Sequence, residues 1–390
     1  MLWQIAWFEI RYWLRSWMLW IFLLVIAASI CFVTSSSEAL EDSGLANIFR
    51  NAPYTITFFY AAMGVLTLLM TAVFVNFTAL RDFSCNTHQM VFSTPVRRRD
   101  FLLGRFFGAT LISAIPMLGV SLGVLLAKYL PWASAEGWAA ANWAAHAKGL
   151  LLFAVPDIFF TAAILFAVAV VWRRDIASFV AVILLIAIRA VTLQLFQGPQ
   201  QEHIRALLDP FGAVTLSVIT KYWTVADKNT LSPDFSGLLL WNRLIWMGVG
   251  CAAFAFAYAR FSFAERRTKN KAVEVDQGAR RDAGTTPACG AGQAATLQLR
   301  DSPWAKVLGS FKVLFHGMAG NTAFVVVGLI ATMICVLALS LTAAHTNTSN
   351  QTFPVTYWVI EQIRGAVNFF LIVVITYFAG ALVWKDRDEH

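Results

Sequence analysis

Long apolar blocks alternate with short polar segments along most of the chain. Each block holds about twenty residues, enough to cross the roughly 30 Å hydrocarbon core of a bilayer as a helix. The blocks are rich in Ala, Gly and aromatic residues and contain almost no Lys, Asp or Glu. The strict alternation of apolar and polar residues that is typical of membrane β-barrels is absent from the sequence. The pattern therefore predicts an all-α polytopic membrane protein.

About eight transmembrane helices are predicted on this basis. They run from about Trp17 to Thr34, Thr57 to Leu80, Phe106 to Ala127, Leu150 to Trp172, Ile176 to Phe196, Leu238 to Tyr258, Thr322 to Thr342 and Ala366 to Trp384. We expect a six-span unit in residues 1–260 and a partly disordered cytoplasmic linker in residues 261–310, where charged and small residues replace the apolar ones. Residues 311–390 repeat the plan of the first two spans, so we expect them to begin a second, incomplete unit.

The first residues predict an amphipathic helix that leads into the first span. Trp3, Ala6, Trp7, Ile10, Trp13, Leu14 and Trp17 share one face, whereas Gln4, Glu9, Arg11, Tyr12, Arg15 and Ser16 share the other. This pattern is typical of a helix that lies in the membrane interface. A simple extension of the first span with a belt of Trp residues is the alternative.

Composition and charge support the membrane class and suggest an orientation. Hydrophobic residues make up 58% of the chain and charged residues 13%, against roughly 25% charged in soluble domains. Soluble enzymes are thereby excluded. The net charge of +8 does not indicate nucleic acid, because most of the 30 Lys and Arg fall in alternate loops. By the positive-inside rule both termini are expected in the cytoplasm, in an inner or plasma membrane.

The segment between the second and third expected spans, RDFSCNTHQMVFSTPVRRRDFLLGRFFGA, predicts a structured cytoplasmic loop. Asp82 can cap a short helix over residues 86–92, which Pro95 ends after Thr94. Such a helix can serve as a binding site for a soluble partner protein. We expect Asn86, Gln89 and Phe92 to contact that partner. A plain basic loop would explain the arginines but not the capped helix.

This loop resembles that of the membrane subunit of type 2 ATP-binding-cassette exporters, where a coupling helix and an stP-v turn precede llGr. A second match covers LLDPFG (residues 207–212), KYWTVADKNT (221–230) and SGLLLWNRLIWMGVG (236–250). These stretches are similar to a branch whose long members carry two six-span halves and a C-terminal zinc aminopeptidase-like domain. The resemblance implies a permease that binds a cytoplasmic ATP-binding-cassette ATPase, with a second permease unit as a further candidate partner.

The departures from that branch limit what the chain itself can do. Four spans of the second half and the peptidase-like domain are missing, so the sequence resembles the front of a longer protein. It contains neither HExxH nor GxxxxGK[ST], the motifs of helical zinc ligation and of phosphate binding. We therefore expect no catalytic residue, metal or cofactor, and no enzyme activity; ATP would be bound by the partner subunit.

Three functions remain open from the sequence. The first is the ATPase-driven permease, and the second is a non-transporting membrane anchor or scaffold for a missing C-terminal domain. The third, an ion-coupled carrier, predicts several acidic residues within the spans, and the chain has few. An opposite charge pair in adjacent spans, Asp157 and Arg189, is expected about 10 Å below the outer boundary of the membrane. We expect these two to form an intramembrane ion pair, with either a structural role or a role in the transport path.

The polar segment from residue 197 to residue 233 is expected outside the membrane. It carries Asp209, Pro210, Trp223 and Asn229. An ordered cap and an unstructured connector both fit this composition.

Overall fold

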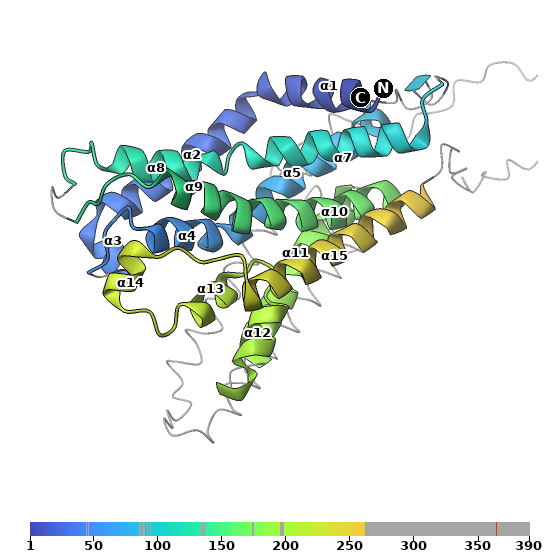
Figure 1. The fold of residues 1–390 in the computed structure, drawn as a ribbon. Coiled ribbons are helices and arrows are strands. Elements are labelled where there is room, and N and C mark those ends of the chain that lie inside the picture. The colour runs from blue at the N-terminus through green and yellow to red at the C-terminus, as the bar shows by residue number, and fades with distance from the viewer. Residues whose placement is uncertain are drawn as a thin grey trace, which may run out of the picture.

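The computed structural model describes residues 1–261, apart from 44, 46, 86, 88, 89, 92, 94, 134–136, 174 and 196–198, together with residue 364. Across this part of the chain all regular structure is helical, and no strand occurs in it (Figure 1). The expected linker and the two expected spans of a second unit lie outside the described residues.

The helices follow the predicted apolar blocks and add several short elements. In chain order they are α1 (Leu2–Leu14), α2 (Trp17–Ser35), α3 (Ser37–Asp42), α4 (Pro53–Ala62), α5 (Gly64–Ser84), α7 (Arg98–Ala114), α8 (Leu118–Ala127), α9 (Trp143–Gly149), the π-helix η1 (Leu150–Ala154), α10 (Val155–Trp172), α11 (Asp175–Leu195), the 3-10 helix η2 (Pro199–Gln201), α12 (Glu202–Leu208), α13 (Ala213–Ile219), α14 (Val225–Thr230) and α15 (Gly237–Arg260).

Among the described residues, five helical segments are long and apolar enough to cross a membrane, as expected of a multi-pass helical membrane protein. They are Trp17–Ser35, Gly64–Phe83, Arg98–Ala127, Trp143–Trp172 and Gly237–Arg260. Each overlaps one of the first six predicted spans. The remaining one, predicted over residues 176–196, falls on α11, which contains a shorter apolar segment, Ala177–Thr192.

The course of the helices is interrupted at three places. The helix pair α4 and α5 breaks at Met63, and α7 and α8 are separated by a turn around Pro116, which has no N–H to donate. Between α9 and α10 the chain widens into a π-helix just before Pro156. This widening removes the clash that proline makes with the preceding turn, and it shifts the face on which the next residue, Asp157, points.

The helices form antiparallel and crossing pairs around α10. The elbow of α1 and α2 lies along α7 and α8, and α10 packs between α5 and α15 (Figure 1). At the α2–α8 crossing a Cβ on Gly119 or Gly123 would lie 2.6 Å from a backbone carbonyl oxygen of α2. Glycine at these two positions four residues apart therefore lets the two backbones approach closely, as is common between membrane helices.

The polar segment before α15 is ordered over much of its length. It contains α12, α13 and α14, and α12 crosses the long helices at a steep angle in Figure 1. Thr224 and Asp227 form a reciprocal capping box at the start of α14, which satisfies backbone donors at that end. Of the two interpretations of this segment, the helices favour an ordered structure.

Candidate functional site

The first candidate site is the loop between α5 and α7, where the sequence predicts a coupling helix. Asn86, Gln89, Phe92 and Thr94 lie outside the described residues, whereas Pro95 is described and exposed. A helical turn is present at residues 90–91. Its backbone is tied to the end of α5, since Thr87 N–H donates to the carbonyl of Asp82 at 2.9 Å.

Asp82 lies at the end of α5 and is engaged in an ion pair. The sequence assigned its side chain to the N-cap of the loop helix, but α5 continues to Ser84 and places Asp82 inside its last turn. The carboxylate is buried and accepts a hydrogen bond from Arg105 Nη2 at 2.6 Å. Most of the helix that Asp82 would cap lies outside the described residues, so the predicted N-cap stays a prediction.

Asp82 belongs to a cluster of four charged side chains from three helices, which we call the loop-base cluster: Glu9, Arg81, Asp82 and Arg105. Arg81 donates to both carboxylate oxygens of Glu9, at 3.0 and 2.5 Å. Arg105 binds Asp82, donates to the carbonyl of Thr78 at 2.9 Å, and lies 3.9 Å from Glu9. The cluster therefore joins α1, α5 and α7 at the point where the loop begins and ends.

The electrostatics of the cluster are balanced, with two carboxylates and two guanidinium groups. Glu9 is fully buried. Its burial raises the pKa of the carboxyl above the ordinary value of 4.5, against the opposing effect of Arg81 and Arg105.

The helical wheel of the sequence places Glu9 on the polar face of α1, away from the Trp residues. A single acidic residue four before the buried Trp13 and three after the buried Ala6 is the available sign that this face packs against protein.

A cavity of about 580 Å³ opens beside the cluster. Its wall combines apolar loop residues, including Met90 and Val96, with Glu9, Asp82 and Arg105 of the cluster. Side chains of the loop and the buried charges therefore share one recess between α1, α5 and α7.

The second candidate site surrounds Asp157, which the sequence pairs with Arg189. In the structure Asp157 Oδ1 instead accepts from Arg243 Nη1 of α15 at 2.7 Å, and the two side chains are 1% and 0% exposed. The guanidinium of Arg189 lies over the ring of Phe211 at 5.1 Å. Asp157 and Arg189 thus approach the same region, but no salt bridge joins them among the described residues.

The sequence analysis does not single out Arg243, which stands six residues after the start of α15. A charged residue at that depth, directly after Asn242, was the signal. Two of its guanidinium nitrogens have partners nearby: Nη1 binds Asp157, and Nη2 donates to the carbonyl of Phe211 at 2.9 Å. The guanidinium also lies 4.9 Å from the ring centre of Phe153.

Arg243 and its neighbours hold the hairpin formed by α12 and α13. Asn242 Nδ2 donates to the carbonyls of Ala206 and Asp209, each at 2.8 Å, and Trp246 donates to that of Leu207 at 3.1 Å. These carbonyls belong to the end of α12, where no helical partner is available.

The turn of the hairpin is specified by its own sequence. Asp209 accepts from the backbone N–H of Val214 at 2.8 Å and of Phe211 at 3.3 Å. Gly212 has φ of +71°, and a Cβ there would lie 1.9 Å from Arg243 Nη2. The LLDPFG and LLLWNRLIW stretches are therefore two halves of one structure, which we call the hairpin clamp: Asp157, Asp209, Asn242 and Arg243.

No group of three His, Cys, Asp or Glu side chains that could hold a metal occurs in the part of the chain that the structure describes. Comparison with known proteins identifies no relative: no family model, no curated protein and no solved structure matches the chain.

Proposed function

We propose that the chain is the transmembrane permease component of an ATP-binding-cassette transporter of the type 2 exporter family. A separate cytoplasmic ATPase would drive movement of the substrate across the membrane. The observation that carries the proposal is the loop between α5 and α7, whose sequence resembles that of the family and whose two ends meet on the loop-base cluster.

The geometry suits the transmission of a displacement from the loop to the bundle. Asp82 stands at the end of α5, three residues before the loop, and Arg105 stands on α7 shortly after it. Because these two side chains bind each other and Glu9 lies beside both, a partner that moves the loop would move three helices together. In the proposal Asn86, Gln89 and Phe92 contact the ATPase, and Thr94 and Pro95 form the turn that returns the chain to α7.

The same proposal sets the orientation in the membrane. Both termini and the loop would lie in the cytoplasm, in agreement with the positive-inside distribution of Lys and Arg. Helix α1 would lie in the membrane interface, and its Trp3 and Trp7 side chains, 74% and 61% exposed, would sit at headgroup level.

Co-purification with an ATPase, and its loss on replacement of Phe92 by Asp, tests the proposal. The tagged chain is isolated from its native membrane in mild detergent, and ATP hydrolysis and the sequence of any bound nucleotide-binding subunit are measured. We expect Phe92→Asp to abolish the association without lowering membrane insertion. Phe235→Asp, at a residue that is 51% exposed before α15, is the matched control and should retain the ATPase.

Two outcomes would contradict the proposal. If the wild-type chain purifies without any ATP-binding-cassette subunit, an anchor or scaffold becomes the better interpretation. If Phe92→Asp retains the subunit as fully as Phe235→Asp does, the ATPase binds elsewhere.

A further inference from the structure

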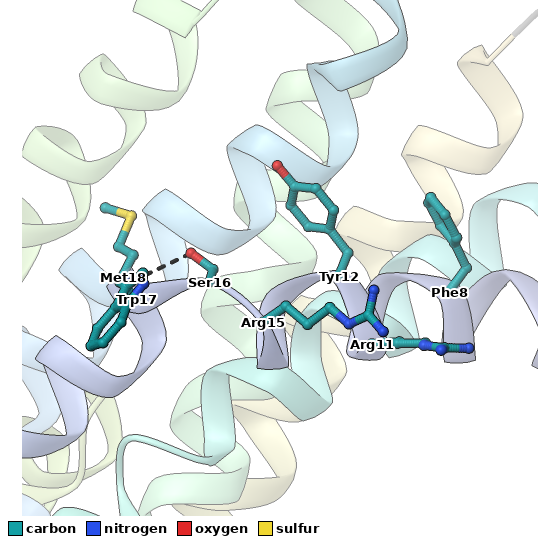
Figure 2. A pocket seen from close by; sticks show the side chains of 7 residues that line it. All are labelled: Phe8, Arg11, Tyr12, Arg15, Ser16, Trp17 and Met18. Atoms are coloured by element: carbon teal, nitrogen blue, oxygen red, sulfur yellow. Dashed lines mark hydrogen bonds between the residues drawn. The ribbon is translucent and has the colours of Figure 1, made fainter.

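The elbow between α1 and α2 contains a surface pocket lined by aromatic and positively charged side chains (Figure 2). Its volume is about 810 Å³, and it is lined by Phe8, Arg11, Tyr12, Arg15, Ser16, Trp17 and Met18. No acidic residue is among these, so the lining carries two positive charges and no negative one.

The lining residues of α1 form a third face of that helix. At 100° per residue, Ile5, Glu9 and Trp13 make up the side that packs on the bundle, and Trp3 and Trp7 make up a second, exposed side. Phe8, Arg11, Tyr12 and Arg15 follow the spacing i, i+3, i+4 and i+7 on the remaining side. Figure 2 shows the two arginine side chains running in the same direction along α1 and the rings of Phe8 and Tyr12 projecting away from the helix.

Contacts with neighbouring residues fix two parts of the pocket, its aromatic side chains and the bend between α1 and α2. Arg81 of the loop-base cluster lies 5.1 Å from the ring centre of Phe8 and 5.0 Å from that of Tyr12. At the elbow itself Trp20 Nε1 donates to the carbonyl of Leu14 at 3.1 Å, and Ser16 caps α2 by accepting from Met18 N–H. The bend is therefore fixed by hydrogen bonds on both of its sides.

The two arginine side chains, in contrast, are exposed. Neither guanidinium forms a salt bridge or hydrogen bond with any residue that the structure describes. Side chains that carry permanent charge and face a shared pocket without a counter-ion are available to an anionic ligand. A guanidinium binds the oxygen atoms of a phosphate with two parallel hydrogen bonds, which an ammonium group cannot do.

We propose that this elbow pocket binds the phosphate-bearing headgroup of an anionic phospholipid. The apolar span begins at Trp17, so the pocket lies at the depth where headgroups meet the hydrocarbon core. Arg11 and Arg15 bind the phosphate, and Phe8, Tyr12 and Trp17 border the glycerol and the first carbons of the acyl chains. This inference goes beyond the proposed transport function and does not depend on an ATPase.

Native mass spectrometry of the purified full chain tests the proposal. The protein in detergent is titrated with phosphatidylglycerol and, separately, with phosphatidylcholine of the same acyl chains, and dissociation constants are obtained from the bound fractions. We expect a preference for phosphatidylglycerol that Arg11→Gln with Arg15→Gln removes, with an affinity loss of about 25-fold if each basic residue contributes roughly fivefold. Because both side chains are exposed and unpaired, the thermal unfolding of the lipid-free variant should equal that of the wild type.

Arg97→Gln with Arg99→Gln is the matched control, since both residues are exposed arginines outside the pocket. It should keep the preference. An equal loss in this control would show that total charge alone attracts the lipid and would overturn the site. Full retention of the preference by Arg11→Lys with Arg15→Lys would do the same, because the lysines preserve charge and remove the paired hydrogen bonds.

Discussion

The loop-base cluster and the hairpin clamp both bury charge between helices, but they do so in different ways. In the cluster, two acids and two bases from three helices bind mainly one another beside a cavity of about 580 Å³. In the clamp, one ion pair that is at most 1% exposed is completed by hydrogen bonds to backbone carbonyls. Side chains that bind side chains can exchange partners, whereas side chains that bind the backbone fix its path. We therefore infer that the clamp is a rigid support and the cluster is an adjustable joint.

The largest expected effect comes from breaking the clamp. Arg243→Leu leaves the carboxylate of Asp157 buried without its partner, which costs about 3 to 5 kcal/mol in stability. Replacing both residues by Leu should restore most of that loss, since neither partner of the ion pair is then left buried alone. Thermal unfolding in detergent measures both variants.

Arg189→Gln provides the matched control for this prediction. Its guanidinium lies over the ring of Phe211 and makes no salt bridge to Asp157, so the loss should be clearly smaller. Equal losses for Arg189→Gln and Arg243→Leu would mean that both arginines support Asp157, and the clamp as described would be wrong.

A smaller effect is expected at the turn that the clamp holds. Gly212→Ala must accept a positive φ and displace the guanidinium of Arg243, whereas Gly237→Ala must accept only the positive φ, because nothing lies within 4 Å of its Cβ. The left-handed conformation alone costs roughly 1 to 2 kcal/mol. Gly212→Ala should therefore unfold at a lower temperature than Gly237→Ala. If the two variants match, Arg243 moves freely and the hairpin is not clamped.

The smallest effect concerns the pH dependence of the cluster. Because the pKa of Glu9 is raised in the folded protein, the folded state holds a proton that the unfolded chain has already lost above pH 4.5. This contribution to stability is present below pH 4.5 and is lost as pH rises through the raised pKa.

Comparing unfolding temperatures between pH 4.5 and pH 7 checks this sign. Glu9→Gln should lose less stability than the wild type over that interval, and Glu38→Gln, at an exposed position in α3, should follow the wild type. A wild-type protein that gains stability relative to Glu9→Gln as pH rises would contradict the proposed role of burial.

The sequence predicts the helices of this fold better than it predicts their contacts. Blocks of apolar residues locate the long helices because each must match the thickness of a bilayer. They do not reveal the break at Met63 or the π-helix that precedes Pro156. They also do not show that the polar segment before α15 folds back as a hairpin.

The charges illustrate the same limit. Asp157 could be recognised as buried from its position within a span, but its partner could not, because Arg189 and Arg243 both stand within reach of the same depth. Glu9 was assigned to the outward face because a helical wheel cannot tell whether lipid or a neighbouring helix covers the apolar side. In both cases the answer depends on the contacts between helices distant in sequence.

The central claim, that a cytoplasmic ATPase binds the loop between α5 and α7, is tested most directly by site-specific photo-cross-linking. A photoreactive residue replaces Met90, which is 71% exposed in the loop, or Tyr222, which is 86% exposed between α13 and α14. The cross-linked products are then identified in native membranes. The account predicts a cross-link from position 90, and none from position 222, to a subunit that contains the GxxxxGK[ST] phosphate loop. A position 90 that yields no such product, in membranes where that subunit co-purifies with the chain, would contradict it.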